Sequence, residues 1–188
     1  KRLHWMAVFL LAAALSAGAS GAPDRVGDFG LLDSDGNFHQ LSRYRNKEAL
    51  VLMSFADSCN SMDSFLTQFK AKQSEWEARN VAFLLINSST EPDLENARNA
   101  LARRQIDIPL LLDDAQVVSE TLDLSKAGEV VVLDPERLAL IYRGPLQSQL
   151  DQSLAAEVAG SADSTSIVEA AGCDLAYPVK DLHAETTP

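Results

Sequence analysis

Two cysteines are the residues of this sequence best suited to chemistry. Cys59 follows an apolar run at residues 49–55 and opens a segment with helical periodicity, and Cys173 is the only other cysteine. At the start of a helix, oriented N–H groups and the helix dipole stabilise a thiolate, which can attack a disulfide or a peroxide. The alternative is a buried structural role for Cys59, because cysteine is among the residue types most often found in cores.

A soft metal site is a second possibility at Cys59. Cys59 and Met62 lie one helical turn apart, and His39 or His183 could supply a third ligand. Thiolate, thioether and imidazole ligands suit copper(I). Met62 also fits the apolar stripe of a helix, and a single histidine on a hairpin is usually a surface residue. We expect no other cofactor, because the chain has no glycine-rich phosphate loop, nucleophile elbow or His-Glu-x-x-His motif.

The elements that must position these side chains alternate between strands and helices. Short apolar runs predict buried strands, and apolar residues at every third or fourth position predict amphipathic helices. This alternation favours an α/β sandwich, and a hairpin near its end favours a mixed sheet. In chain order we expect a hairpin within residues 27–41, a strand at 49–55, a helix from near Cys59 through Trp76, a strand at 81–86, a helix opened by residues 89–92 and running to about 105, a strand at 108–112, a short helix at 115–122, a hairpin of strands 129–133 and 138–142, and a helix at 148–158.

Two groups of charged residues have competing interpretations. Asp33 and Asp35 have the spacing of a calcium loop, but Tyr44 stands at the twelfth position, where such a loop has glutamate. We therefore interpret this segment as a turn. Arg143 follows a predicted strand and could contact an anion, but a charge at a strand end is the simpler interpretation.

The first nineteen residues have the features of an export signal. A basic start at Lys1 and Arg2 precedes an apolar run, and Ala17-Gly18-Ala19 has the small-residue pattern that signal peptidase reads. We expect a signal peptide at 1–19, cleavage after Ala19 and a periplasmic protein. The alternative is an uncleaved anchor, but the apolar run is shorter than the ~20 residues that span a bilayer. We therefore expect no membrane span once the signal is removed.

Composition limits the remaining possibilities. The chain has 188 residues and a formal net charge of -11, from 16 Lys and Arg against 27 Asp and Glu. This charge repels phosphate backbones, so nucleic acid is not an expected partner. The length fits one domain with short appendages. We place the domain at residues 25–160 and a tail containing Cys173 at 161–188, with enough apolar residues between 167 and 177 for part of the tail to dock on the domain.

At this point the motifs resemble a known family. The segment Val51-Leu52-Met53-Ser54-Phe55-Ala56-Asp57-Ser58-Cys59 resembles the strand-to-helix segment of thioredoxin-fold proteins, in which a reactive cysteine opens the helix. Residues 81–87, 108–118, 129–134 and 142–144 are similar, in order, to redoxins of the alkyl hydroperoxide reductase and thiol-specific antioxidant type, in their exported bacterial form. The resemblance covers about residues 25–160. It implies a thioredoxin-like three-layer α/β/α sandwich with a mixed central sheet and an N-terminal β-hairpin.

Three departures from the family pattern bear on activity. The resemblance implies a second cysteine in C-x-x-C, but Met62 stands there, so Cys59 has no local partner. Peroxiredoxins have a threonine three residues before the reactive cysteine and a proline four residues earlier, where this chain has Ala56 and Leu52. The family's cis-proline opposite the reactive cysteine corresponds to Gly128. These differences indicate a degenerate or atypical active site.

The pairing of the two cysteines stays open at this level. Export favours a single bridge between Cys59 and Cys173, which would contribute roughly 4–5 kcal/mol by chain entropy. If the tail folds back over the helix of Cys59, Cys173 could instead be a labile resolving cysteine that captures a sulfenic acid. Two separate thiols are the third possibility.

Two functional hypotheses follow. The first is a weak or atypical thiol oxidoreductase or peroxidase, with Cys59 and Cys173 as catalytic residues and a protein thiol reductant as partner. The second is a non-catalytic thioredoxin-fold module that binds another exported protein and in which a Cys59–Cys173 bridge is structural. A reactive Cys59 thiolate favours the first, whereas a buried or permanently bridged Cys59 favours the second.

Overall fold

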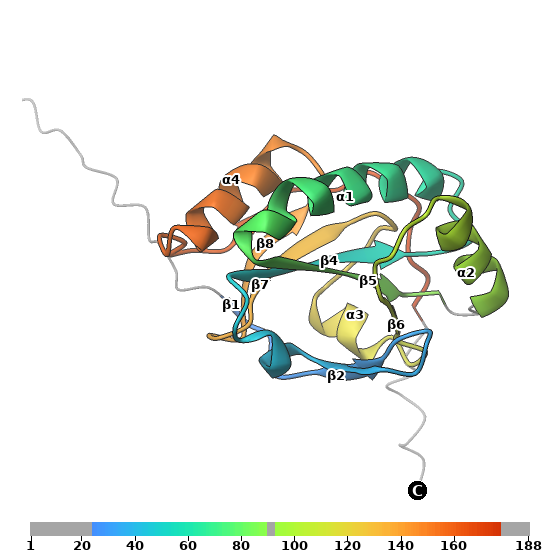
Figure 1. The fold of residues 1–188 in the computed structure, drawn as a ribbon, viewed down its shortest axis with the longest axis horizontal. Helices are drawn as coiled ribbons and strands as arrows, with labels where there is room; N and C mark the ends of the chain where they lie inside the picture. Colours follow the sequence, from blue (N-terminus) through green and yellow to red (C-terminus); the bar gives the residue numbers. More distant parts are fainter. Residues whose placement is uncertain (1–23, 90–92, 178–188) are drawn as a thin grey trace, which may run out of the picture.

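The protein forms one mixed sheet with helices on both faces (Figure 1). The computed structural model describes residues 24–89 and 93–177. The strand order is β1-β8-β7-β4-β5-β6, with β9 also beside β8, and a separate two-stranded hairpin pairs β2 with β3. The elements are β1 (Asp24–Arg25), β2 (Gly30–Leu32), β3 (Phe38–Gln40), η1 (Leu41–Tyr44), β4 (Ala49–Phe55), α1 (Met62–Trp76), η2 (Glu77–Arg79), β5 (Val81–Asn87), α2 (Leu94–Arg103), β6 (Leu110–Leu112), α3 (Val117–Thr121), β7 (Val130–Asp134), β8 (Ala139–Gly144), α4 (Ser148–Val158) and β9 (Ser166–Ile167).

Strand β4 is the centre of the core. All seven of its residues are buried. It runs parallel to β5 and antiparallel to β7, with Leu52 opposite Leu84 on one side and Val131 on the other. A strand covered on both faces has a continuous apolar run rather than an alternation of apolar and polar residues. This explains the almost entirely apolar sequence of residues 49–55. The predicted central strand is therefore confirmed.

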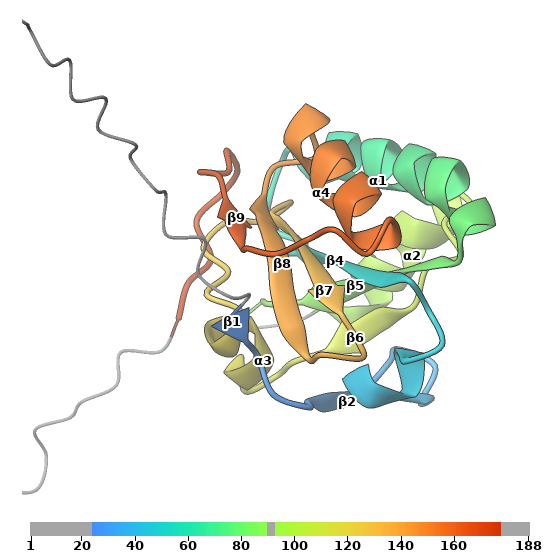
Figure 2. The same cartoon turned by 90° about the vertical axis from the view of Figure 1, so that its left-hand side faces the viewer.

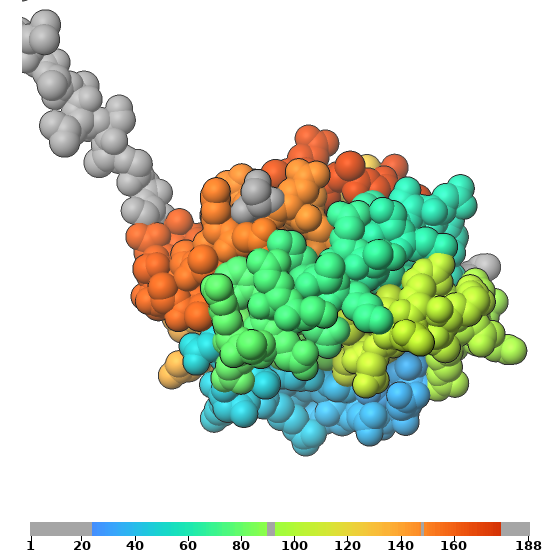
Figure 3. Space-filling view, turned by 45° about the horizontal axis from the view of Figure 1, so that its top comes forward, coloured from blue at the N-terminus to red at the C-terminus, as the bar shows by residue number. Residues whose placement is uncertain are grey.

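Helices α1, α2 and α4 cover one face of the sheet, and α3 with the β2–β3 hairpin covers the other (Figure 1). Figure 3 shows α4 beside α1 on the first face. The Lys72 ammonium of α1 donates to the Asp151 carboxylate of α4 at 2.7 Å, and the Trp76 indole donates to the same carboxylate at 3.3 Å. The three-layer α/β/α sandwich with a mixed sheet and an N-terminal hairpin is confirmed.

The hairpin turn is organised by Asp33. Its Oδ1 accepts N–H bonds from Asp35 at 2.9 Å and Asn37 at 2.8 Å, and its Oδ2 lies 2.9 Å from Nε2 of His39. Burial raises the pKa of Asp33, but the bonds from His39 and Asn37 outweigh it and lower this pKa to about 2. The predicted turn is present, and the backbone bridge from Asp33 to Leu111 joins it to β6.

Element ends differ from the predictions in several places. The first long helix begins at Met62, three residues after Cys59. Helix α2 begins at Leu94, and its N-cap is Asp93, whose carboxylate accepts the N–H of Asn96 at 2.9 Å. The predicted start at Thr90 and Pro92 lies outside the described residues. The two-residue strands β1 and β9 were not predicted, because two residues carry no periodicity; only pairing with β8 defines them.

Two expectations concern export and the membrane. The predicted signal peptide at residues 1–19 lies outside the described residues. Among the helices of residues 24–89 and 93–177, none combines the length and the apolar character needed to cross a membrane.

An ion network of two buried carboxylates and one exposed arginine joins helix α4 to the turn between β7 and β8. Arg137 contacts the Asp134 carboxylate through Nε and donates to Glu157 at 2.9 Å through Nη2. Glu157 is 8% exposed. Burial and the nearby charge of Asp134 raise the pKa of Glu157 to about 7, although Arg137 acts in the opposite direction. At neutral pH this carboxyl group is therefore close to its midpoint.

This network predicts a pH-dependent stability. The pKa of Glu157 rises from 4.5 to about 7 on folding, so the folded protein favours the protonated carboxyl group. The stabilisation that this protonated form contributes is fully present below pH 4.5 and is lost as the pH rises through 7. We expect the free energy of unfolding of the wild-type protein to fall by on the order of 1–3 kcal/mol more than that of Glu157→Gln between pH 5 and pH 8, measured by urea denaturation. Glu136→Gln, at an exposed carboxylate of the same turn, is the control, and equal pH slopes for Glu157→Gln and the wild type would contradict the assignment.

Candidate functional site

A disulfide joins Cys59 to Cys173. The two Cα atoms are 5.7 Å apart, within the usual range for a disulfide, and 114 residues separate the cysteines in sequence. Cys59 is 4% exposed, whereas Cys173 is partly exposed. Among the alternatives left open by the sequence, the structure selects a single bridge. The two predicted catalytic cysteines are thus brought together in one site.

Cys59 lies in a turn between β4 and α1. Its N–H donates to the carbonyl of Ala56 at 3.1 Å, and its own carbonyl accepts the N–H of Met62 at 3.0 Å. The prediction that Cys59 lies in the first turn of the helix is wrong, because these turns place it before the N-cap, Ser61. The stabilisation of a thiolate by a helix dipole falls off within the first turn. Reactivity at Cys59 therefore depends on the surroundings of the disulfide more than on the helix.

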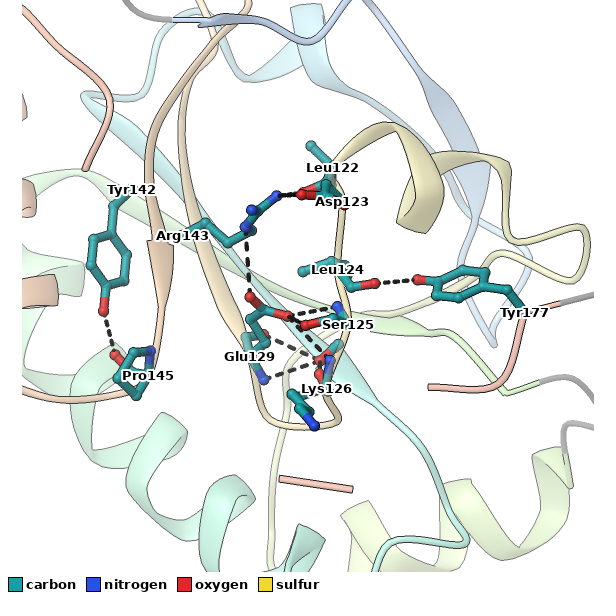
Figure 4. Close-up of polar contacts among 11 residues, drawn as sticks. Leu122, Asp123, Leu124, Ser125, Lys126, Glu129, Tyr142, Arg143, Pro145 and Tyr177 are labelled. Carbon is teal, nitrogen blue, oxygen red and sulfur yellow. Dashed lines mark hydrogen bonds and ion pairs between the residues drawn. The ribbon is translucent and has the colours of Figure 1, made fainter. Parts of the chain in front are cut away.

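The loop of residues 122–129 packs against the disulfide-bearing tail and is held by two charged residues (Figure 4). Glu129 is 3% exposed, and its Oε2 accepts the N–H groups of Ser125 at 2.7 Å and Lys126 at 3.2 Å. Arg143 donates to the carbonyl of Leu122 at 3.2 Å and lies 3.6 Å from Oε1 of Glu129. Arg143, from β8, thus fixes this loop from within the fold, in keeping with its interpretation as a strand-end charge.

The same loop is tied to the end of the central strand by Ser54. The Ser54 hydroxyl donates to the carbonyl of Lys126 at 2.5 Å, and the N–H of Gly128 donates to the Ser54 carbonyl at 2.9 Å. Gly128 has φ +83°, and a Cβ atom there would overlap the ring of Phe65 from α1. Glycine is therefore required at this position for a packing reason. The described residues contain no cis peptide bond.

The tail docks on this loop as an extended segment. The N–H of Ala127 donates to the carbonyl of Cys173 at 2.8 Å, and the N–H of Leu175 donates to the carbonyl of Ser125 at 2.9 Å. An antiparallel bridge between Lys126 and Asp174 lies between these two bonds. Leu175 is buried. In Figure 2 the tail passes β9 and descends beside α3. The prediction that part of the tail docks on the domain is confirmed.

Two side chains, Gln116 and Tyr177, complete the docking of the tail, and sequence reasoning missed the first of them. The Gln116 amide, 1% exposed, donates to the carbonyl of Ser88 at 2.7 Å and to that of Ala176 at 2.9 Å. The Tyr177 hydroxyl donates to the carbonyl of Leu124 at 2.6 Å (Figure 4). No motif marks Gln116, because its partners are backbone carbonyls from distant segments. Burial raises the pKa of Tyr177 to about 12, so its hydroxyl stays a donor.

The proposed copper ligands are not assembled in this oxidised structure. The sulfur of Cys59 is bound to Cys173. His39 contacts Asp33 through Nε2 and the Tyr44 hydroxyl through Nδ1, at 2.9 and 2.5 Å. His183 lies outside the described residues. Met62 is 4% exposed and packs in the core, as the apolar stripe predicted.

The disulfide predicts a measurable loss of stability when it is removed. We expect Cys173→Ala to lower the free energy of unfolding by roughly 2–4 kcal/mol, because the bridge closes a long loop in the unfolded chain. Guanidinium denaturation without reductant measures the difference. The wild-type protein in reductant should fall to the level of the variant, and a variant as stable as the oxidised wild type would contradict this account.

Comparison with solved structures identifies the same fold elsewhere. A hypothetical protein from Sinorhizobium meliloti 1021 superposes with a TM-score of 0.71 at 20% identity, over 86% of this chain and 97% of that one. The peroxidoxin BcpB from Mycobacterium tuberculosis gives a TM-score of 0.60 at 22% identity, over 73% and 96% of the two chains. A secreted disulfide oxidoreductase from Mycobacterium tuberculosis gives 0.54 at 15% identity, over 70% and 95%.

Comparison of sequences gives the family. No curated protein matches this sequence significantly. The model of the AhpC/TSA family matches residues 22–141, which include Cys59 and the loop but not the tail with Cys173. That match covers well over half of the chain, and the sheet, hairpin and helices described above have the thioredoxin-like arrangement. The protein therefore belongs to the AhpC/TSA family of thioredoxin-fold redoxins.

Proposed function

We propose that this protein is a thiol–disulfide oxidoreductase whose redox couple is the pair Cys59 and Cys173. The observation that supports this most directly is the disulfide between the turn that follows the central strand and a docked tail. Met62 replaces the second cysteine of the usual local dithiol. Cys173 supplies the missing sulfur from the tail, so the pair can still exchange two electrons.

The exposure of the two cysteines suggests the order of the exchange. An external thiolate attacks Sγ of Cys173, which is the more exposed partner, and Cys59 leaves as a thiolate. A mixed disulfide between Cys173 and the substrate forms. A second substrate thiolate then attacks the substrate's own sulfur, which releases Cys173 as a thiolate and leaves the substrate as a disulfide. The substrate dithiol loses two electrons, and the protein disulfide gains them; the reverse sequence reduces a substrate disulfide.

A hydroperoxide is the less favoured substrate. Reduced Cys59 could take one oxygen from a hydroperoxide to give a sulfenic acid and an alcohol, and the Cys173 thiol would then form the disulfide with loss of water. The chemistry balances, and the pair is close enough to complete it. However, Ala56, where peroxiredoxins have a threonine, supplies no hydroxyl to position a peroxide. Disulfide exchange needs no such group.

The proposed place of action is the periplasm. The basic start, apolar run and Ala17-Gly18-Ala19 of the leader support export. The similarity to a secreted disulfide oxidoreductase is consistent with it. In an oxidising compartment the Cys59–Cys173 disulfide persists until a specific thiol reaches it. The partner we propose is accordingly a protein thiol reductant or another exported protein that carries thiols.

A second candidate is a non-catalytic module that binds another exported protein. It is favoured by the burial of Cys59, at 4% exposed, and by tail contacts on both sides of Cys173. Both features protect a disulfide from attack. In this case the bridge would be structural, and its reduction potential would lie below the range of redox enzymes.

The reduction potential and a turnover assay separate the two candidates. For an oxidoreductase we expect a Cys59–Cys173 potential of about -180 to -270 mV, determined by mass spectrometry of alkylated thiols in glutathione and dithiothreitol buffers. We also expect the protein to accelerate the reduction of insulin disulfides by dithiothreitol. Cys59→Ala and Cys173→Ala should each lose this acceleration at least about tenfold, because each lacks half of the couple. A potential below about -300 mV with no acceleration would favour the structural disulfide of a binding module.

A further inference from the structure

We propose that the docking of residues 172–177 selects the oxidised protein, so that Gly172 and Tyr177, as positioning residues, set the reduction potential of the Cys59–Cys173 pair. The inference rests on the proposed function for its biological use. The docking contacts themselves are independent of any substrate.

Gly172 permits the close approach of the tail to the loop. A Cβ atom at this position would collide with the backbone carbonyl oxygen of Ala127. Backbone atoms cannot move aside as the end of a flexible side chain can. The same Ala127 donates its N–H to the carbonyl of Cys173. Only glycine at position 172 therefore lets the tail approach Ala127 closely enough to form this hydrogen bond.

Tyr177 and Gln116 hold the chain after Cys173. The Tyr177 hydroxyl is 2.6 Å from the carbonyl of Leu124, at the other end of the docking loop from Ala127. Gln116 is buried with φ +54°, an unusual backbone conformation for a residue other than glycine. Such a conformation persists only where the surrounding structure holds it. Its amide links the tail to the end of β5 through the carbonyls of Ala176 and Ser88.

These contacts are too few to keep the segment ordered without the disulfide. Within residues 172–177 only Leu175 is buried, and Cys173 and Tyr177 are partly buried. Ordering six residues costs backbone entropy at each position, and this burial of apolar side chains offsets only part of that cost. The covalent bond to Cys59 removes much of the entropy in advance. The segment is therefore docked in the oxidised protein and released when the bridge is reduced.

The coupling between docking and oxidation is reciprocal. In the exchange, the protein disulfide and two glutathione thiols give two protein thiols and one glutathione disulfide. Contacts made only in the oxidised protein stabilise that side of the equilibrium, and the disulfide stabilises the contacts by the same factor. A substitution that weakens docking must then make the bridge easier to reduce. If the tail stayed docked in both states, the same substitution would leave the equilibrium unchanged.

Two variants with matched controls test this. Tyr177→Phe removes one hydroxyl that donates to a backbone carbonyl, and Tyr142→Phe removes another, which donates to the Pro145 carbonyl at 2.8 Å and lies apart from Tyr177 (Figure 4). Gly172→Ala places a methyl group against the docking loop, and Gly30→Ala places one against the Phe38 ring of the hairpin. The measured quantity is the equilibrium constant for forming the protein disulfide, in glutathione or, for a more reducing couple, dithiothreitol buffers.

We expect Tyr177→Phe to lower that constant about two- to tenfold, the effect of one hydrogen bond, and Gly172→Ala to lower it about tenfold or more. Both controls should stay within about twofold of the wild type. Exchange of the Ala127 and Leu175 amide hydrogens in the wild-type protein provides a second measurement. Protection of both should be lost when the bridge is reduced.

The inference is overturned if the two tail variants shift the constant no more than their controls, or if the two amides stay protected in the reduced protein. Either result would mean that the tail remains docked in both redox states. Failure of the proposed function has a different signature. The variants would still change the equilibrium constant, while the wild-type protein would not accelerate the reduction of insulin.

Discussion

The hydrogen bonds between Ser54 and the loop of residues 126–129 are the constraint on which the site depends. Ser54 is the penultimate residue of the central strand, five residues before Cys59, and its hydroxyl and backbone fix the loop through Lys126, Gly128 and Glu129. Because β4 lies between two other strands with every residue buried, it is a rigid support for the loop. The hydrogen bonds to Ser54 hold the loop in place, and the loop in turn supports the tail that carries Cys173. The positions of both sulfurs therefore depend on β4.

This arrangement replaces a local dithiol with one that spans the fold. In a C-x-x-C motif the two sulfurs approach each other through helix geometry alone. Here Met62 fills that position as a core residue, and the second sulfur arrives from 114 residues away. The energetics of the couple then include the entropy of ordering the tail and the contacts that hold it. The redox equilibrium of such a disulfide depends on substitutions far from either cysteine. The equilibrium of a local C-x-x-C disulfide depends on them less.

Several buried carboxylates lie where the layers of the protein meet. Asp33 organises the hairpin and faces β6, Glu129 and Arg143 fix the loop before β7, and Glu157 with Arg137 joins α4 to the sheet. Each of these carboxylates accepts hydrogen bonds, which is the condition under which a buried polar group is tolerated. Such groups favour one arrangement of the layers over others of similar apolar burial. Glu129 and Arg143 are the pair that holds the loop against which the disulfide-bearing tail packs.

Local signals in the amino-acid sequence were enough to predict most of the elements. Apolar runs predicted β4, β5 and the β7–β8 hairpin, turn residues predicted the first hairpin, and helical periodicity predicted α1 and α4 to within a few residues. The motifs also singled out Cys59 and Cys173 as the candidate site. The three-dimensional structure was needed to show that the two cysteines are bonded and that Cys59 precedes the helix. It was also needed to show that β1 and β9 join the sheet and that Gln116 and Tyr177 hold the tail. The reason is that periodicity and turn chemistry act between neighbours in sequence. By contrast, the sheet must first bring remote backbone segments together before a disulfide, a two-residue strand or a hydrogen bond to a distant carbonyl can form.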